Sequence, residues 1–298
     1  MPSVIAIDDP AVVTLAECIA GLDGTGFTPR DEDTVHEAAR WLRRLGNNRS
    51  FLGDILLDAL RGVDCGEQDD SAYTPQSLML SGYRAGYFLR ANIWPCPTDQ
   101  AYRASGAGAF AYGVPHDHNF DFLTIGYHGP GYESDYWEYD YEAVAGFPGE
   151  TAGLRHTGRR TLSPGMILHY RAHRDVHAQL PPQSLSVSLN IMATDPAQGW
   201  FDQYRFDPLS DTVTGVLSPN STEVFLRAAV ACGSEEALDL AAWIGRTHPA
   251  DRLRLAAFEA RAEQESDPAR CDAIWQEAEQ SGSRLVAGVA ARNRREQA

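Results

Sequence analysis

Apolar and polar positions follow a helical period in the first part of the chain. Between residues 10 and 61, apolar side chains recur at intervals of three and four, the spacing of amphipathic helices. One helix is expected to start near Thr28, a candidate N-cap followed by proline and acidic residues, and to end at Gly46. Another is expected over residues 50–61. The pattern therefore predicts an N-terminal helical segment, residues 1–86.

The period shortens to two residues from Tyr87, which is the period of a β-strand. Residues 87–94 alternate and stop at Pro95. Further short strands are expected at residues 108–113, 121–128, 134–142, 166–171, 176–179 and 184–192. Glycine and proline turns separate them, a pattern typical of antiparallel sandwiches and small barrels. Residues 87–206 are therefore predicted to form a β-domain.

Helical periodicity returns after residue 207. Helix starts with capping chemistry lie near Ser221, Ser234, Pro249, Asp267 and Ser281. Alanines within these segments allow helices to pack closely. The pattern predicts a C-terminal module of antiparallel helical hairpins, residues 207–298, similar to a short solenoid. The fold class expected for the whole chain is α+β.

Composition places the chain among soluble globular proteins. It has 298 residues, of which 43% are hydrophobic and 10% aromatic. No apolar run approaches the length of a membrane span, about 18 residues, so no membrane association is expected. The N-terminus lacks a basic segment followed by an apolar one. A cytoplasmic location is therefore expected.

The charged and sulfur-containing residues exclude several classes of function. A net charge of −16 disfavours nucleic-acid binding, which depends on cationic contacts to phosphates. The chain has no lysine, which removes a Schiff-base lysine and the P-loop lysine. The cysteines are scattered without a C-x-x-C motif, and we expect free thiols at Cys18, Cys65, Cys96, Cys232 and Cys271.

Histidines within the predicted β-domain are candidate metal ligands. His116 and His118 form an H-x-H pair, and residues i and i+2 of a strand point to the same face. A third ligand must come from another strand. His177 is the best candidate and His173 is the alternative. Three imidazoles suit a divalent first-row metal, such as iron, nickel, copper or zinc.

The spacing around these histidines resembles the cupin superfamily. The motifs that carry the resemblance are Gly113-x-x-His116-x-His118 and Pro164-Gly165 with His177 twelve residues further on. The resemblance covers roughly residues 87–192. It implies a central cupin-type antiparallel β-barrel with a metal inside the barrel mouth. The glutamate usual after the second histidine is absent, since Phe122 and Leu123 occupy its positions and Asp121 is the nearest carboxylate.

The missing glutamate makes the site similar to three-histidine cupins, among them the cysteine dioxygenase-like thiol dioxygenases. That resemblance implies mononuclear Fe(II), held by His116, His118 and His177, with dioxygen as co-substrate. The chain departs from those enzymes in a late strand, where Ser188-Leu189-Asn190-Ile191-Met192 replaces their Ser-His-Tyr arrangement. A generic iron oxygenase or hydroxylase is therefore the interpretation, rather than an enzyme acting on cysteine.

Other polar residues on the predicted strands are candidates for catalysis. Glu138 shares a strand face with Tyr136 and is a candidate general base or fourth ligand, alongside Asp121. Arg90 and Arg171 are candidates for binding a substrate carboxylate, because a guanidinium pairs bidentately with it. Each of these residues also has an ordinary structural interpretation, as part of a half-exposed strand or a surface ion pair.

The leading hypothesis is a cytoplasmic non-haem Fe(II) dioxygenase or hydroxylase acting on a small, amino-acid-like or carrier- or peptide-linked substrate. Zinc, nickel and copper are the alternative metals. A second hypothesis is a non-redox metallo-cupin, an isomerase, epimerase or lyase. A third is a non-catalytic sensor whose helical module docks a protein. The C-terminal helices are also the expected site of a homodimer or partner contact.

Overall fold

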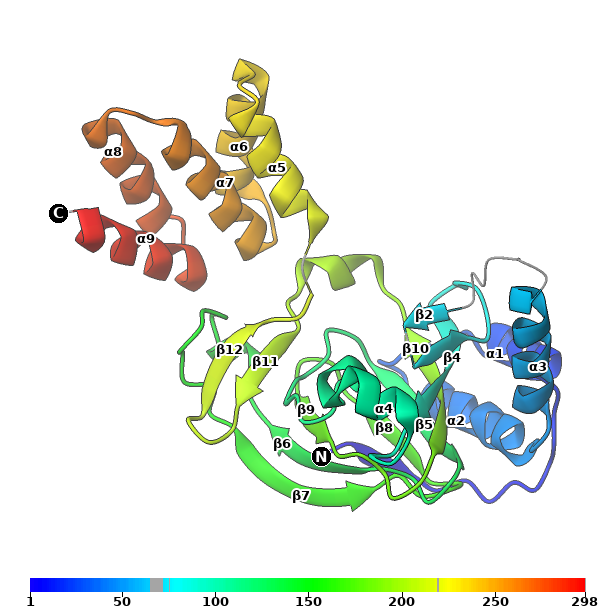
Figure 1. Cartoon of the computed structure of the whole chain (residues 1–298). Helices are drawn as coiled ribbons and strands as arrows, with labels where there is room; N and C mark the ends of the chain where they lie inside the picture. Colours follow the sequence, from blue (N-terminus) through cyan, green and yellow to red (C-terminus); the bar gives the residue numbers. More distant parts are fainter. Residues whose placement is uncertain (65–71, 75, 219, 298) are drawn as a thin grey trace. The chain divides into compact units, whose positions relative to one another are not determined.

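The computed structural model divides the chain into two compact units, drawn in Figure 1. The residues described are 1–64, 72–74, 76–218 and 220–297. The first unit comprises Met1–Tyr141, Ala152–Gln198 and Arg205–Thr212. The second comprises Glu142–Thr151, Gly199–Tyr204 and Val213–Ala298.

The N-terminal helices of the first unit are α1 (Leu15–Thr25), α2 (Glu32–Asn47) and α3 (Phe51–Asp64). The N-cap of α2 is Asp31, whose carboxylate accepts from the backbone of Asp33 and Thr34. The expectation of an N-cap at Thr28 is wrong, because the Thr28 carbonyl instead accepts from the Asp31 N–H and the Thr34 hydroxyl. The loop thus continues three residues further before the helix begins.

The main sheet of the first unit has strands in the order β1-β8-β5-β10-β4-β3-β2. Their bounds are β1 Ser3–Ile5, β2 Ala72–Thr74, β3 Ser77–Met79, β4 Tyr87–Trp94, β5 Phe122–His128, β8 Ile167–Tyr170 and β10 Ser186–Ala193. All adjacent pairs in this sheet are antiparallel. The central strand β10 is buried along its whole length, between β4 and β5.

Alternation along the main sheet separates two cores. Val187, Leu189 and Ile191 of β10 pack with α1, α2 and α3 in one apolar cluster. The other face contributes Met192, together with Phe88 and Trp94 of β4, to a second cluster rich in aromatic rings. This second cluster also contains Tyr136, which belongs to a different sheet, so the two sheets pack against each other.

The second sheet has three strands in the order β7-β6-β9. Its strands are β6 (Glu133–Glu138), β7 (Arg155–Thr161) and β9 (Asp175–Gln179). The register of β6 and β9 sets Tyr136 opposite His177. Both side chains therefore lie in the interior between the two sheets. A separate pair, β11 (Tyr204–Asp207) and β12 (Thr212–Val216), completes the strands.

Two sequence-based strands differ from the structure. Residues 108–113 were expected to be extended, but Ala107–Phe110 form a 3-10 turn that ends at Ala111 in the left-handed region. The strand expected over 134–142 stops at Glu138, because Tyr141–Ala143 form another 3-10 turn. In both segments a local turn forms instead of backbone pairing with a neighbouring strand. The alternation of apolar and polar residues does not distinguish the two outcomes.

The antiparallel α+β architecture is confirmed, while the closed cupin barrel stays a prediction. Within the described residues the strands divide into separate sheets of seven, three and two strands. Isolated bridges connect His116 to His177 and Gly126 to Pro164 between or beside these sheets. His177 lies in β9 and Gly126 in β5, while His116 and Pro164 lie outside the named strands, so neither bridge joins two of these sheets.

The second unit is mostly helical. Its helices are α5 (Ser221–Ala231), α6 (Glu235–Thr247), α7 (Asp251–Gln264), α8 (Pro268–Glu279) and α9 (Arg284–Gln297). Ser234 and Asp267 cap α6 and α8 as expected from sequence. Helix α7 begins at Asp251, two residues after the start expected at Pro249, and α9 begins at Arg284, three residues after the start expected at Ser281. Helix α7 contacts the other four.

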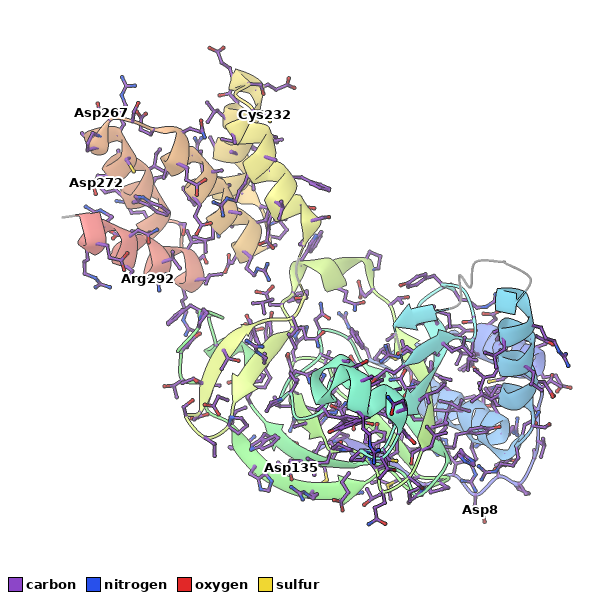
Figure 2. All side chains as sticks on the ribbon, in the orientation of Figure 1. Asp8, Asp135, Cys232, Asp267, Asp272 and Arg292 are labelled. Carbon is purple, nitrogen blue, oxygen red and sulfur yellow. The ribbon has the colours of Figure 1, made fainter. Side chains whose placement is uncertain are left out.

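The described cysteines form no disulfide, in agreement with the free thiols that the sequence predicts. Cys18 and Cys96 are buried, while Cys232 at the end of α5 is exposed (Figure 2). Cys65 lies outside the described residues. Among the described helices, none combines the length and the apolar character needed to cross a membrane.

Candidate metal centre

Backbone hydrogen bonds place the H-x-H segment beside β9. The N–H of His116 donates to the carbonyl of His177 at 3.0 Å, and the N–H of His177 donates to the carbonyl of His116 at 2.9 Å. Asp117 points the other way and accepts a 2.5 Å hydrogen bond from the Tyr139 hydroxyl. The alternation expected of an extended segment therefore turns both histidines toward one side, next to His177.

The three imidazoles converge on one point. Each of His116, His118 and His177 offers a ligand atom, and these atoms all lie within 4.8 Å of one another. The Nε2 atoms of His118 and His177 are 3.0 Å apart. Two nitrogens bound to one ion at about 2.1 Å, at right angles, are separated by about 3 Å. The spacing of this pair is that of adjacent ligands on a metal.

Burial keeps these histidines neutral. Their side chains are buried, and desolvation lowers the pKa of His116 and holds the pKa of His118 and His177 well below the usual value for histidine. The Nδ1 of His116 lies 2.7 Å from the Val114 carbonyl, so it carries the proton and leaves the Nε2 lone pair available. Neutral imidazoles with such lone pairs are the form that binds a metal.

The Nε2 atoms test whether the cluster fits a metal or a simple core. Those of His118 and His177 face each other in a buried site, and the Nε2 of His116 keeps its lone pair for an ion. Burying polar atoms costs about 1–3 kcal/mol for each one left without a partner, which apolar packing does not offset by itself. Three neutral nitrogen ligands with this mutual geometry match the donor set of first-row divalent ions. The residues fit a metal ion.

Aromatic rings surround the cluster. The rings of Phe120 and Phe122 lie 4.8 and 4.9 Å from the His118 ring, and Tyr170 lies 4.9 Å from His177. Tyr136 is parallel to His177 at 6.5 Å. These walls exclude water from one side of the site and restrict what can approach it.

A pair of buried tyrosines was not singled out from the sequence as part of the site. The hydroxyls of Tyr136 and Tyr170 are 2.9 Å apart, and both rings are fully buried beside His177. Burial raises the pKa of both hydroxyls, so both remain protonated at neutral pH. Alternation in β6 places Tyr136 inside, but only the pairing of β6 with β9 shows that it faces His177.

Arg90 faces the same interior as the histidines. It alternates along β4 with Leu89 and Ala91, which pack against the helices, so its side chain extends toward the second sheet. Its positive charge contributes, after desolvation and the two neighbouring imidazoles, to the lowered pKa of His118. Its predicted role in binding a substrate carboxylate stays a prediction.

Glu138 and Arg171 contact each other rather than the histidine cluster. The Arg171 guanidinium binds Glu138 at 2.9 Å and Asp175 at 2.6 Å, and Asp175 is fully buried. The Met1 amino group, 2.7 Å away, and Arg171 hold the pKa of Glu138 at about 2. A carboxylate with such a pKa is a weak base near neutral pH, and its catalytic role stays a prediction.

Replacing Arg171 with methionine is expected to lower the free energy of unfolding by about 2–3 kcal/mol, because the buried Asp175 loses its bidentate partner. Urea denaturation measures this change. The matched control is Arg174→Met. Arg174 is 54% exposed, and its contact with Glu138 is long, at 3.4 Å. A loss below about 0.5 kcal/mol is therefore expected in this variant. Equal losses in the two variants would contradict the structural role given to Arg171.

The alternative ligands from the sequence lie elsewhere. His173 is in a turn with φ of 59°, where its N–H donates to the His118 carbonyl at 2.8 Å and its ring packs on Tyr141. Asp121 lies 3.3 Å from His169. Among the described residues, neither belongs to the three-histidine cluster. His173 thus hydrogen-bonds the backbone of a candidate ligand and lies outside the cluster.

The fold and the site define an antiparallel α+β protein with a buried three-histidine centre suited to a metal ion. No model of a known protein family matches the sequence, and no curated protein matches it either.

Comparison with solved structures gives remote similarities. The crystal structure of the DMSP lyase DddQ from Ruegeria pomeroyi DSS-3 is 12% identical, with a TM-score of 0.25, over 48% of this chain and 64% of that one. The chain thus spans less than two thirds of that protein. Crystal structures of the DMSP lyases RdDddP and RnDddQII give 11% identity and a TM-score of 0.27, over 68% and 84%. Similarities of this size establish neither fold nor activity.

Proposed function

We propose that the protein is a metal-dependent enzyme whose ion is held by His116, His118 and His177. The observation that carries the proposal is the convergence of three buried, neutral imidazoles, two of them with Nε2 atoms 3.0 Å apart. A site that served only packing would not gather three titratable rings at this cost in desolvation. Three protein ligands, rather than four, are typical of catalytic centres that keep open positions for substrate.

A bound divalent ion would supply Lewis acidity and a coordination position for the reacting group. The chain's own residues then have separate tasks. The aromatic walls of Phe120 and Phe122 hold an apolar part of the substrate and exclude water. Arg90 offers positive charge for an anionic substrate group. Because three neutral ligands leave the charge of the ion uncompensated, an anionic substrate is favoured.

For the reaction itself, the first candidate is oxygenation of a small substrate by an Fe(II) centre with dioxygen. Neutral nitrogen ligands suit iron as well as other first-row ions, and open positions leave room for both a substrate and dioxygen. The substrate class that fits the charge of the site is a small carboxylate, amino-acid-like or linked to a carrier or peptide.

A second candidate is non-redox chemistry, a lyase or isomerase, and the Tyr136–Tyr170 pair favours it. Their hydroxyls form a 2.9 Å hydrogen bond next to His177. A tyrosine hydroxyl can donate a proton, or accept one after losing its own, when a cation lies nearby. In this reaction a hydroxyl of the pair would donate its proton to the substrate, and a bound ion, held by the three histidines, would supply Lewis acidity.

The test is a comparison of metal content and of nitric oxide binding. Protein purified without oxygen is expected to hold about one first-row metal per chain, measured by elemental analysis. Iron that gives a high-spin ferrous–nitrosyl EPR spectrum would support an oxygenase centre with an open position. Zinc or nickel, or iron without the nitrosyl spectrum, would favour the non-redox reaction. Absence of any metal, even after incubation with Fe(II), Zn(II) and Ni(II), would overturn the proposed centre.

A further inference from the structure

Helix α5 is apolar on two opposite faces. Leu226 and Val230 on one face are buried against α7. The opposite face is exposed, with Val224 at 66% and Phe225 at 68% of their full exposure. This outer face consists of Val224, Phe225, Ala228, Ala229, Ala231 and Cys232. A helix with apolar side chains on two opposite faces is typical of one covered on both sides.

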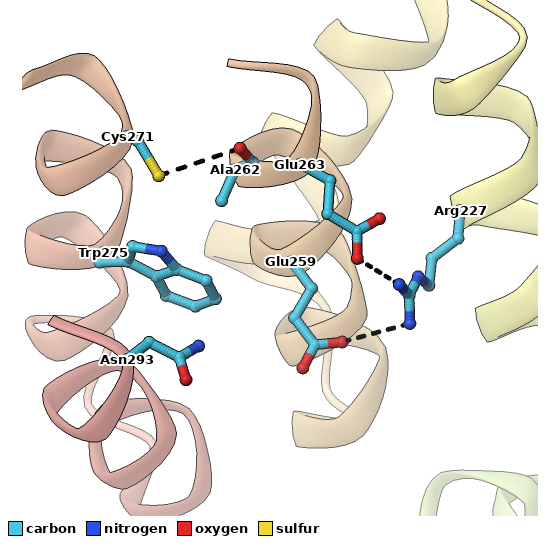
Figure 3. Close-up of a pocket in the computed structure, with 7 residues that line it drawn as sticks. All are labelled: Arg227, Glu259, Ala262, Glu263, Cys271, Trp275 and Asn293. Carbon is cyan, nitrogen blue, oxygen red and sulfur yellow. Dashed lines mark hydrogen bonds and ion pairs between the residues drawn. The ribbon is translucent and has the colours of Figure 1, made fainter. Parts of the chain in front are cut away.

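The charged residues of α5 both turn toward α7. Arg252 of α7 binds Glu223 at 2.5 Å. Arg227 forms ion pairs with Glu259 and Glu263 of α7, as Figure 3 shows. The outer face is therefore left without a charged side chain. In a chain with a net charge of −16, this is a surface where two copies can meet without opposing acidic groups.

The outer face is also complementary to itself in shape. Its large side chains, Val224 and Phe225, lie toward the N-terminal end. Its small ones lie toward the C-terminal end and are Ala228, Ala229, Ala231 and Cys232. Two such helices packed antiparallel set the large side chains of each over the small ones of the other. Alanines at the crossing allow the helix axes to approach to about 8 Å.

We propose that α5 forms a two-fold interface with a second copy of this chain, centred on Ala228. The contact is isologous, so each protomer uses the same face. Antiparallel pairing about Ala228 places Val224 of one protomer opposite Cys232 of the partner subunit. The interface belongs to the helical unit, and its test does not depend on metal binding or on catalysis.

Sedimentation equilibrium of the full chain under reducing conditions tests the interface. We expect a species of twice the chain mass of 32.7 kDa, which the double variant Phe225→Glu/Ala228→Glu converts to monomer. The matched control is Trp243→Glu, because Trp243 is a 58% exposed aromatic residue on α6. Far-UV circular dichroism confirms that the variants keep their helices. A wild-type monomer, or dissociation by Trp243→Glu as well, would overturn the proposal.

Cysteine cross-linking tests the antiparallel geometry. In the Cys232→Ser background, Ala228→Cys is expected to form a covalent dimer on mild oxidation, since the two-fold axis brings the two thiols together. Val224→Cys in the same background is expected not to cross-link above the background level. Its two copies lie about 12 Å apart along antiparallel helices, beyond disulfide reach. Cross-linking of both variants would indicate a parallel arrangement and overturn the proposed pairing, as would cross-linking of neither.

Discussion

An alanine at position 177 is expected to abolish metal binding. Purified wild-type protein should contain about one metal ion per chain, and the His177→Ala variant should contain almost none. His177 is 2% exposed, and its Nε2 lies 3.0 Å from that of His118, so its removal deletes one of the three converging imidazoles that we propose as ligands. Changing a residue that merely orients a ligand already costs about 10–100-fold in affinity, and loss of a ligand is expected to cost more.

The control for this experiment is His128→Ala, which removes an exposed imidazole at the end of β5. Its metal content should equal that of the wild type, whereas His116→Ala and His118→Ala should behave like His177→Ala. The comparison with His173→Ala separates the two third ligands considered from sequence. Retained metal in His177→Ala together with lost metal in His173→Ala would contradict the assignment.

Metal binding is expected to raise the thermal stability of the first unit by several degrees. An ion that binds only the folded state contributes about 2.7 kcal/mol at a free concentration of 100 times its Kd. For a unit of this size, that contribution corresponds to an increase in Tm of about 5–10 °C. The increase is expected in the first unit because the ion would bind its imidazole nitrogens, which otherwise are buried and face one another.

Differential scanning calorimetry measures this shift, with and without a chelator. The helical unit provides an internal control, because a transition that belongs to it should not respond to metal. The His116→Ala variant is the second control and should melt at one temperature under both conditions. A metal-dependent shift of equal size in His116→Ala would show that the ion binds elsewhere.

Local sequence determined those features that neighbouring residues decide among themselves. The strand over 87–94 has the observed bounds of β4, because strict alternation matches a sheet with one helix-covered face and one interior face. Ser234 and Asp267 cap helices, since a cap depends only on a side chain and the next few backbone groups. The convergence of His116 and His118 follows likewise from the two-residue repeat of an extended chain.

Sequence also failed where long-range pairing decides. The strands that were not predicted include β1, which has only three residues, and β7, which is largely exposed and rich in arginine. Their extended conformation comes from ladders with β8 and β6. The residues of a short segment do not show which distant strand will pair with it.

Only the tertiary structure shows that His177, and not His173, lies in the cluster with His116 and His118. Two backbone hydrogen bonds between His116 and His177 join segments about sixty residues apart, while His173 turns into a left-handed bend. The Tyr136–Tyr170 pair and the ion pairs of Glu138 arise in the same way, from strands that meet only in the folded chain. Side-chain type and spacing identified the candidate site residues, and the packing of two sheets determined which of them face one another.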